Sequence, residues 1–355
     1  MPNIVVRHPK DLTTNWAQRV VNKHSPGAVV GHVDILSVDV GTTTRVRLNV
    51  EHNDPATLPR QWFVKLPSLA WQARLITALP RLLHTEVRFY NEIASAVAVT
   101  MPSLLAAESQ LGKGATLVLP DLLALGAKLG HPRDALSYSE AALVVAQLAK
   151  LHACFWQGES LRHNYRWMAG PVRQLEDFLG TALAVPLMRR GLYLAGDIVP
   201  ASLHAGALRY AKNRREAMRF MSSMPQTLVH HDCHPGNLYW QHSQPGLLDW
   251  QLVRLGEGIS DIAYLLATAL NPETRRAHEA DLIAIYAQSL AAQGIACTPT
   301  PALWQRYRAH LCYPFEAMVV TLAIGGLMDL DSNRELIRRA AIAVADQEAF
   351  KALPI

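Results

Sequence analysis

The sequence has few cysteines, and their positions exclude the most familiar cysteine-based architectures. The 355 residues contain four, at Cys154, Cys233, Cys297 and Cys312, and no C-x-x-C pair occurs. A small secreted domain held together by disulfides would have an even number of closely spaced cysteines. We therefore expect reduced thiols, as in a cytoplasmic protein.

Long hydrophobic segments and runs of positive charge are also missing. The longest uncharged apolar run, residues 317–328, is about half a membrane span. Residues 1–10 show no hydrophobic signal-peptide core, and no more than two Lys or Arg residues are consecutive. We therefore expect a cytoplasmic protein with no membrane insertion and no nucleic-acid partner. The net charge of +5 nevertheless suits anionic small ligands such as nucleotides.

The composition is that of an ordinary globular protein. Half of the residues are hydrophobic and 18% are charged, so a large core can form. The length allows one large domain or two. Nothing in the sequence indicates an oligomeric state.

Polar side chains are densest in residues 228–251, between two apolar runs. They are His230, His231, Asp232, His234 and Asn237, followed twelve residues later by Asp249. The Pro-Gly pairs at 235–236 and 245–246 predict turns. We expect a hairpin-like unit that brings Asp232, Asn237 and Asp249 to one end.

These side chains suit phosphoryl transfer. A carboxylate such as Asp232 can orient an attacking hydroxyl and accept its proton. The oxygens of Asn237 and Asp249 are hard ligands of the kind that Mg²⁺ prefers. One base-like Asp with an Asn/Asp metal pair is the arrangement of kinase-type sites.

Two other interpretations of this stretch are open. His230 and His234, with Cys233 between them, could bind zinc, although zinc sites usually have three or four spaced ligands and the sequence contains no H-E-x-x-H motif. The stretch could also be a structural loop without chemistry. We expect His230 and His234 to hold the loop by hydrogen bonds and to have no chemical role.

The sequence of the N-terminal part predicts a small β-structure that contains one buried cation. Residues 29–40 and 45–50 alternate as strands around Gly41 and Thr42, which form either an ordinary hairpin turn or a loop over phosphates. In the strand 61–66, Lys65 needs an acidic partner if it is buried. Glu86, on a helix expected over residues 81–97, is the first candidate, and Glu92 on the same helix is the second.

The stretch around Asp232 resembles a known family. His230–Asn237 matches the H-x-D-x-H-x-x-N pattern of the aminoglycoside phosphotransferase and choline kinase families. Leu248-Asp249-Trp250 resembles their metal-binding segment, and the chain looks closest to the ecdysteroid-kinase-like branch. This resemblance implies an α+β, protein-kinase-like two-lobe fold. We expect an antiparallel-sheet, nucleotide-binding lobe over residues 1–120 and a helical lobe over 121–355, with a substrate-binding insert near 160–220.

The resemblance also implies roles for individual residues. Asp232 would be the catalytic base, and Asn237 and Asp249 would hold Mg²⁺, with Asp261 bracing the loop. ATP is the expected nucleotide, and GTP remains an alternative. The residues expected to bind it are Lys65, Glu86, Gly41, Thr42 and Leu119, the last in a hinge where Pro120 has no N–H to donate.

The charge composition of the insert indicates which class of phosphate acceptor to expect. Residues 161–220 contain ten Lys or Arg against four Asp or Glu, with aromatic residues interleaved. A polycationic aminoglycoside would prefer an acidic cleft, so the composition favours a neutral, apolar or anionic alcohol. The expected activity is that of an alcohol kinase. A nucleotide-binding pseudokinase and a metal-dependent hydrolase are the alternatives.

The C-terminal part is expected to be helical. Two capping boxes, Ser137–Glu140 and Ser332–Glu335, predict the starts of helices over 141–155 and 333–349. Further helices are expected over 273–292 and 302–323. His152, in the first of these helices, is expected to be a hydrogen-bonded core residue.

Overall fold

The computed structural model describes residues 3–70, 82–110, 112–296 and 300–355. Cys297 and residue 81, the first residue of the helix predicted over 81–97, lie outside these ranges. The chain separates into two compact units. The sheet unit comprises residues 1–96, 101–129 and 248–252, and the helical unit comprises 97–100, 130–247 and 253–355.

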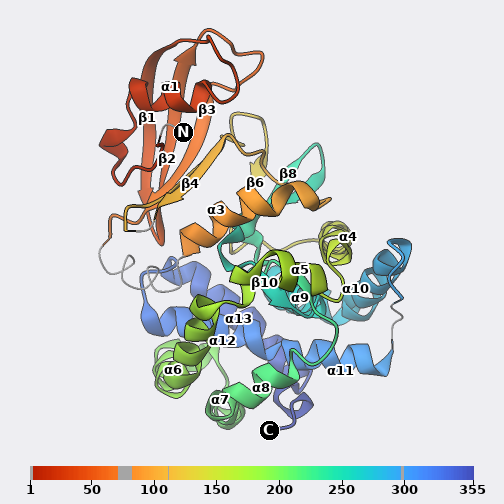
Figure 1. The fold of residues 1–355 in the computed structure, drawn as a ribbon. Coiled ribbons are helices and arrows are strands. Elements are labelled where there is room, and N and C mark those ends of the chain that lie inside the picture. The colour runs from red at the N-terminus through yellow and green to blue at the C-terminus, as the bar shows by residue number, and fades with distance from the viewer. Residues whose placement is uncertain (1–2, 71–81, 111, 297–299) are drawn as a thin grey trace. The chain divides into compact units, whose positions relative to one another are not determined.

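The sheet unit is built on a five-stranded antiparallel sheet in the order β1-β2-β3-β5-β4 (Figure 1). The strands are β1 (Val30–Val40), β2 (Thr43–His52), β3 (Gln61–Pro67), β4 (Ala106–Gln110) and β5 (Gly114–Pro120). Two helices, α1 (Thr14–Val21) and α3 (Leu82–Glu92), and the two-residue strand β6 (Lys128–Leu129) belong to the same unit. The predicted strands and helices are present here, with ends shifted by a few residues.

Alternation along β3 decides which side chains face which helix. Val64 and Leu66 are fully buried in a hydrophobic cluster that includes Trp16 of α1. Because successive side chains of a strand point to opposite faces, Lys65 points to the other face, where it contacts Glu86 of α3. The apolar pattern of β3 therefore places a single buried cation opposite the main core of the unit.

The helical unit consists largely of packed helices. Its helices are α4 (Tyr138–Cys154), α5 (Glu159–Asn164), α6 (Pro171–Ala195), α7 (Ala201–Lys212), α8 (Arg214–Phe220), α9 (Ile259–Ala269), α10 (Pro272–Ala292), α11 (Pro301–His310), α12 (Cys312–Ile324) and α13 (Leu330–Asp346). The Ser137–Glu140 capping box is confirmed, with both of its reciprocal hydrogen bonds present. It fixes the start of α4.

Two of the predicted helices have different bounds from those expected. The helix predicted over 302–323 is two helices, since α11 ends at His310 and α12 begins at Cys312. The capping box predicted at Ser332 is wrong. Asp329 caps α13 instead, accepting a hydrogen bond from the Ser332 N–H at 2.9 Å, so the helix begins one turn earlier.

A hairpin follows the polar stretch, but its turn is not where it was predicted. Strands β8 (Leu238–Gln241) and β9 (Gln244–Leu247) pair antiparallel. The turn lies at His242 and Ser243, both with positive φ. Pro245 and Gly246 are part of β9, where a Cβ at Gly246 would lie 2.2 Å from the Tyr239 ring. The glycine therefore permits close cross-strand packing and does not reverse the chain.

Together these features give a protein-kinase-like α+β fold with a small antiparallel-sheet lobe and a larger helical lobe, as predicted. Two short strands, β7 (Thr227–Val229) and β10 (Arg254–Gly256), pair in the helical lobe just before and after the polar stretch. Among the described residues, no helix is long and apolar enough to cross a membrane.

Candidate active site

In the sheet unit, a buried cluster of charges surrounds Lys65. Its ammonium group donates to both carboxylate oxygens of Glu86, at 2.8 and 2.9 Å. Glu86 also accepts from the Trp250 N–H and from the Gln251 side chain, each at 3.3 Å. Glu92, the other candidate partner, instead pairs with Arg88 at the surface. The geometry thus selects Glu86.

The cluster keeps Lys65 charged. Burial alone would lower the pKa of Lys65, but the charges of Asp249 and Glu86 raise it above its ordinary value. Burial raises the pKa of Glu86, and Lys65 opposes that shift. A buried ammonium held in this way is a fixed positive charge, suited to contact with phosphate oxygens.

Asp249 completes the cluster in an unusual backbone conformation. Its carboxylate lies 3.3 Å from the Lys65 ammonium, and a third of its side chain is exposed. Its φ is +62°, in the left-handed region that non-glycine residues seldom adopt. Such conformations persist only where the surroundings enforce them, and they concentrate at functional sites. Phe89, which stacks on the adjacent Trp250 with centroids 4.0 Å apart, packs this short segment against α3.

In the helical unit, Asp232 is held from two sides. One carboxylate oxygen accepts from the Tyr264 hydroxyl at 2.6 Å, and the other accepts from the Asn237 side-chain amide at 2.9 Å. Burial and the charge of Asp232 raise the pKa of Tyr264 well above its ordinary value, so the phenol remains a donor. The carboxylate is oriented while about a fifth of its side chain stays exposed.

The orientation of Asn237 suits a metal ligand. Its Nδ2 donates to both the backbone oxygen and the carboxylate of Asp232, which offer acceptors only. The amide oxygen must therefore point away from Asp232. A carbonyl oxygen turned outward and a partly exposed carboxylate at Asp249 are the donor types that Mg²⁺ prefers, so these residues fit the expected ion.

Asp261 holds the backbone of the loop that carries Asp232. Its carboxylate is fully buried and accepts from the backbone N–H groups of His230 and His231, at 2.7 and 2.8 Å. His152 also contacts it at 3.2 Å and bonds Tyr286 through its other ring nitrogen. This arrangement fixes a tight bend in which His231 has a φ of +70°.

The remaining residues predicted around the loop have structural contacts. His234 caps the 3₁₀ turn Pro235–Asn237 by accepting from the Gly236 N–H at 3.1 Å, and its Nε2 lies 3.8 Å from Asp232. Among the described residues, no group of three or more His, Cys, Asp or Glu side chains is placed to hold a metal. The structure thus offers no support for the zinc interpretation there.

Gly41, Thr42 and Leu119 lie at or near the ends of strands. Gly41 and Thr42 form the β1–β2 turn, where the Gly41 carbonyl accepts from the Ser68 hydroxyl at 2.6 Å. Leu119 is buried near the end of β5 and pairs with Phe63 of β3. Their role towards a nucleotide remains a prediction.

Sequence reasoning missed Tyr264 and Gln251. Tyr264 lies three residues after Asp261 on α9, so the two share one helix face, and this spacing could have indicated it. Gln251 follows Asp249 by two residues, and its contact with Glu86 joins segments that are 165 residues apart. No local pattern predicts a contact of that kind.

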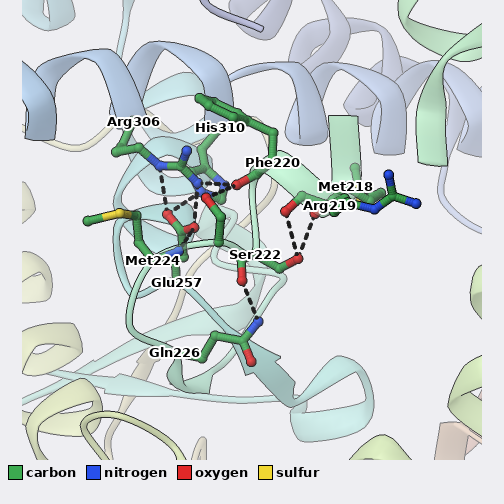
Figure 2. A network of polar contacts seen from close by, with 10 residues as sticks. Met218, Arg219, Phe220, Ser222, Met224, Gln226, Glu257, Arg306 and His310 are labelled. Atoms are coloured by element: carbon green, nitrogen blue, oxygen red, sulfur yellow. Dashed lines mark hydrogen bonds and ion pairs between the residues drawn. The ribbon is translucent and has the colours of Figure 1, made fainter. Parts of the chain in front are cut away.

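A second ionic network in the helical unit, shown in Figure 2, is centred on Glu257. The Glu257 carboxylate accepts from Arg306, from His310 at 3.1 Å and from the Met224 N–H at 3.0 Å. Arg306 lies 4.1 Å from the centroid of the Phe220 ring. Burial alone would raise the pKa of Glu257, but the bonds from His310 and Arg306 bring it below its ordinary value.

Replacing Glu257 by glutamine should lower the free energy of unfolding by about 3 kcal/mol at pH 7, because Arg306 would lose its buried anionic partner. The pKa of Glu257 is lower in the folded state than in the unfolded state. Its ion pairs therefore contribute fully to the free energy of unfolding of the wild type above the unfolded-state pKa, and this contribution is lost as the pH falls through the folded-state pKa. Urea unfolding at pH 7 and pH 4 should therefore show that the free energies of unfolding of the wild type and the Glu257→Gln variant differ less at pH 4. An equal difference at both values would contradict the ionic role.

Comparison with protein families identifies a match to this chain. The family described as "Phosphotransferase enzyme family" (APH) matches residues 49–310, which is most of the chain. That range includes Lys65, Glu86, Asp232, Asn237 and Asp249. No curated protein matches the sequence.

Solved structures share the fold at low sequence identity. Choline kinase from Cryptosporidium parvum Iowa II is 11% identical, with a TM-score of 0.55 and coverage of 95% of this chain and 97% of that one. The GDP complex of aminoglycoside 2'-phosphotransferase-IIIa is 13% identical, with a TM-score of 0.54 and coverage of 94% and 99%. LicA in complex with AMP is 13% identical, with a TM-score of 0.50 and coverage of 95% and 99%. These similarities establish the fold.

Proposed function

Because the chain belongs to the APH phosphotransferase enzyme family, a family of small-molecule kinases, we propose that it transfers the γ-phosphoryl group of ATP to a hydroxyl group of a small molecule. The observation that carries this proposal is the position of Asp232. Its carboxylate is fixed by Tyr264 and Asn237 and yet remains accessible.

The proposed reaction follows from these residues. Asp232 orients the acceptor hydroxyl and accepts its proton as the new P–O bond forms. The bond between the γ-phosphorus and the oxygen that bridges it to the β-phosphate breaks, and ADP leaves with that electron pair. Catalysis is then mainly positioning and charge stabilisation.

Lys65 and its cluster are proposed to bind the nucleotide. The ammonium, fixed by Glu86, neutralises phosphate oxygens, and Gly41 and Thr42 contact the phosphates through their backbone. Leu119 is proposed to lie against the base. Structural neighbours with GDP and with AMP support nucleotide use and leave both ATP and GTP open.

As metal ligands we propose Asn237 in the helical unit and Asp249 in the sheet unit. Mg²⁺ would supply charge neutralisation of the phosphates. His230, His234 and Asp261 are proposed to support the loop without touching the reacting atoms. The lobe boundary near residue 120 and the substrate-binding role of residues 160–220 belong to the same proposal.

Thermal unfolding with MgATP, MgGTP and Zn²⁺ tests the nucleotide site. We expect one Mg·nucleotide to stabilise the protein by about 2.7 kcal/mol at a concentration about 100 times its Kd. Incubation of that nucleotide with a panel of alcohols should then yield the nucleoside diphosphate and a phosphorylated alcohol in equal amounts.

Each other outcome points to a different class of protein. Stabilisation by a nucleotide without transfer to any alcohol would favour a pseudokinase. Stabilisation by zinc alone would contradict the kinase proposal and favour a metal-dependent hydrolase.

A further inference from the structure

A cavity of about 590 Å³ lies within the helical unit, beside the loop that carries Asp232. His231, the residue before Asp232, lines it, and so does Tyr313, which stacks on His231 with centroids 4.0 Å apart. The Tyr313 ring is 6.0 Å from that of Tyr264, the residue that donates to Asp232. A ligand in this cavity would therefore lie beside the loop that carries the proposed catalytic base.

The lining of this cavity is strongly basic. Among the described residues that line it, two are acidic, Asp177 and Glu257. Six arginines line it: Arg162, Arg173, Arg214, Arg215, Arg219 and Arg254. A cationic ligand would meet net repulsion here.

Several of these charges are already neutralised by the protein. Ion pairs join Arg173 to Glu176 at 2.7 Å, Arg214 to Glu316 at 2.6 Å and Arg254 to Asp177 at 3.0 Å. The other lining acid, Glu257, is bound to Arg306 and His310. Neither lining acid is therefore available to neutralise a further cation.

Three arginines have no such partner. Within the described ranges, Arg162, Arg215 and Arg219 form no ion pair, and the Arg162 guanidinium bonds only the neutral side chain of Gln226. Arg215 and Arg219 are exposed and lie four residues apart on α8, so their side chains share one helix face. In Figure 2 the Arg219 side chain extends away from the Glu257 network.

The electrostatic field of the cavity acts on His231. Burial, followed by the charges of Arg254 and Arg173, lowers the pKa of His231 well below its ordinary value. The imidazole is therefore neutral at neutral pH. Its buried Nδ1 has no hydrogen-bond partner among the described residues, and neither has the buried hydroxyl of Ser260, which also lines the cavity.

The rest of the lining is mixed, with five polar residues (Gln174, Thr181, Ser222, Gln226 and His310). Its apolar side chains are those of Met168, Ala169, Phe178, Met218, Met221 and Leu255. A lining that combines these apolar side chains with two unpartnered polar atoms and unpaired guanidinium groups suits a ligand with a hydroxyl, an apolar body and an anionic group.

We propose that this cavity binds the phosphate acceptor and that the acceptor is an alcohol with an apolar body and a carboxylate or phosphate group. The anionic group contacts Arg215 and Arg219, whose guanidinium groups can bind either anion in a bidentate manner. The hydroxyl lies at the His231 end. This inference rests on the proposed function and commits it to an anionic substrate class.

Binding of four matched alcohols without nucleotide tests the inference. They are ω-hydroxydecanoate, ω-hydroxydecyl phosphate, decanediol and ω-aminodecanol, measured by isothermal titration calorimetry at about 0.15 M salt. We expect at least one of the two anions to bind about 100-fold more tightly than the diol and the amine, because two guanidinium groups contact the anion and each contact contributes about tenfold. The tighter of the two anions identifies the anionic group.

Arginine variants test whether these residues cause the preference. The double substitution Arg215→Gln and Arg219→Gln should weaken anion binding about 100-fold and leave the diol unaffected. Arg189→Gln is the matched control, since Arg189 is an exposed arginine on α6 that does not line the cavity.

Two results would overturn the inference. One is binding of the amine or the diol as tight as that of the anions. The other is a double variant that binds the anions as tightly as Arg189→Gln does. Because these measurements need no nucleotide, failure here is distinguishable from failure of the nucleotide site, which the MgATP stabilisation reports separately.

Discussion

Replacing Asp232 by alanine should lower the turnover of phosphoryl transfer about 10³-fold, while the stabilisation by Mg·nucleotide persists. The carboxylate would be lost from the one position where Tyr264 and Asn237 orient it. The nearby carboxylate of Asp261 cannot replace it, because Asp261 is fully buried and its oxygens are occupied by the backbone N–H groups of His230 and His231.

Steady-state kinetics with the accepted alcohol would measure this effect. Asp281→Ala is the matched control, because it removes an exposed acid from α10 of the same unit. Thermal shifts with nucleotide should be equal for the wild type and both variants, which separates catalysis from folding. Turnover of Asp232→Ala close to that of the control would show that Asp232 is not the base.

The architecture was predictable because local patterns agree with the fold. The alternation in β2, the strand at residues 61–66 and the Ser137–Glu140 capping box were visible in the sequence, and all three are present. The predictions were wrong where the same short sequence is compatible with two local structures. Pro245 and Gly246 have turn composition, but the glycine allows the Tyr239 ring to pack closely across the hairpin. Asp329 and Ser332 can both cap α13, and the earlier residue does so.

The candidate site was predictable to the extent that its residues are close in the sequence. The stretch containing Asp232 and Asn237 could be recognised from its pattern, and Lys65 required a partner because it lies in an apolar strand. The charge excess of residues 161–220 was also visible. Which of those arginines line a cavity depends on tertiary packing, so Arg215 and Arg219 could not be distinguished in the sequence from Arg189.

Replacing Asp249 by asparagine should abolish stabilisation by Mg·nucleotide, with a loss of affinity of at least about 100-fold, or about 2.7 kcal/mol. Asparagine tolerates the left-handed conformation that Asp249 adopts, so the substitution removes the negative charge without new backbone strain. Lys65 keeps its two bonds to Glu86, so the buried cation remains paired. The loss can therefore be assigned to the carboxylate as a metal ligand.

Magnesium titration separates this explanation from an effect on Lys65. In the wild type, stabilisation by ATP should depend on Mg²⁺ and disappear with a chelator, whereas Asp249→Asn should show the same weak effect with and without Mg²⁺. Asp249→Ala should behave in the same way towards Mg²⁺ but unfold more readily, since alanine at a φ of +62° costs about 1 kcal/mol or more. If Asp249→Asn retained a Mg²⁺-dependent shift of wild-type size, Asp249 would not be a metal ligand, and its contact with Lys65 would have a structural role only.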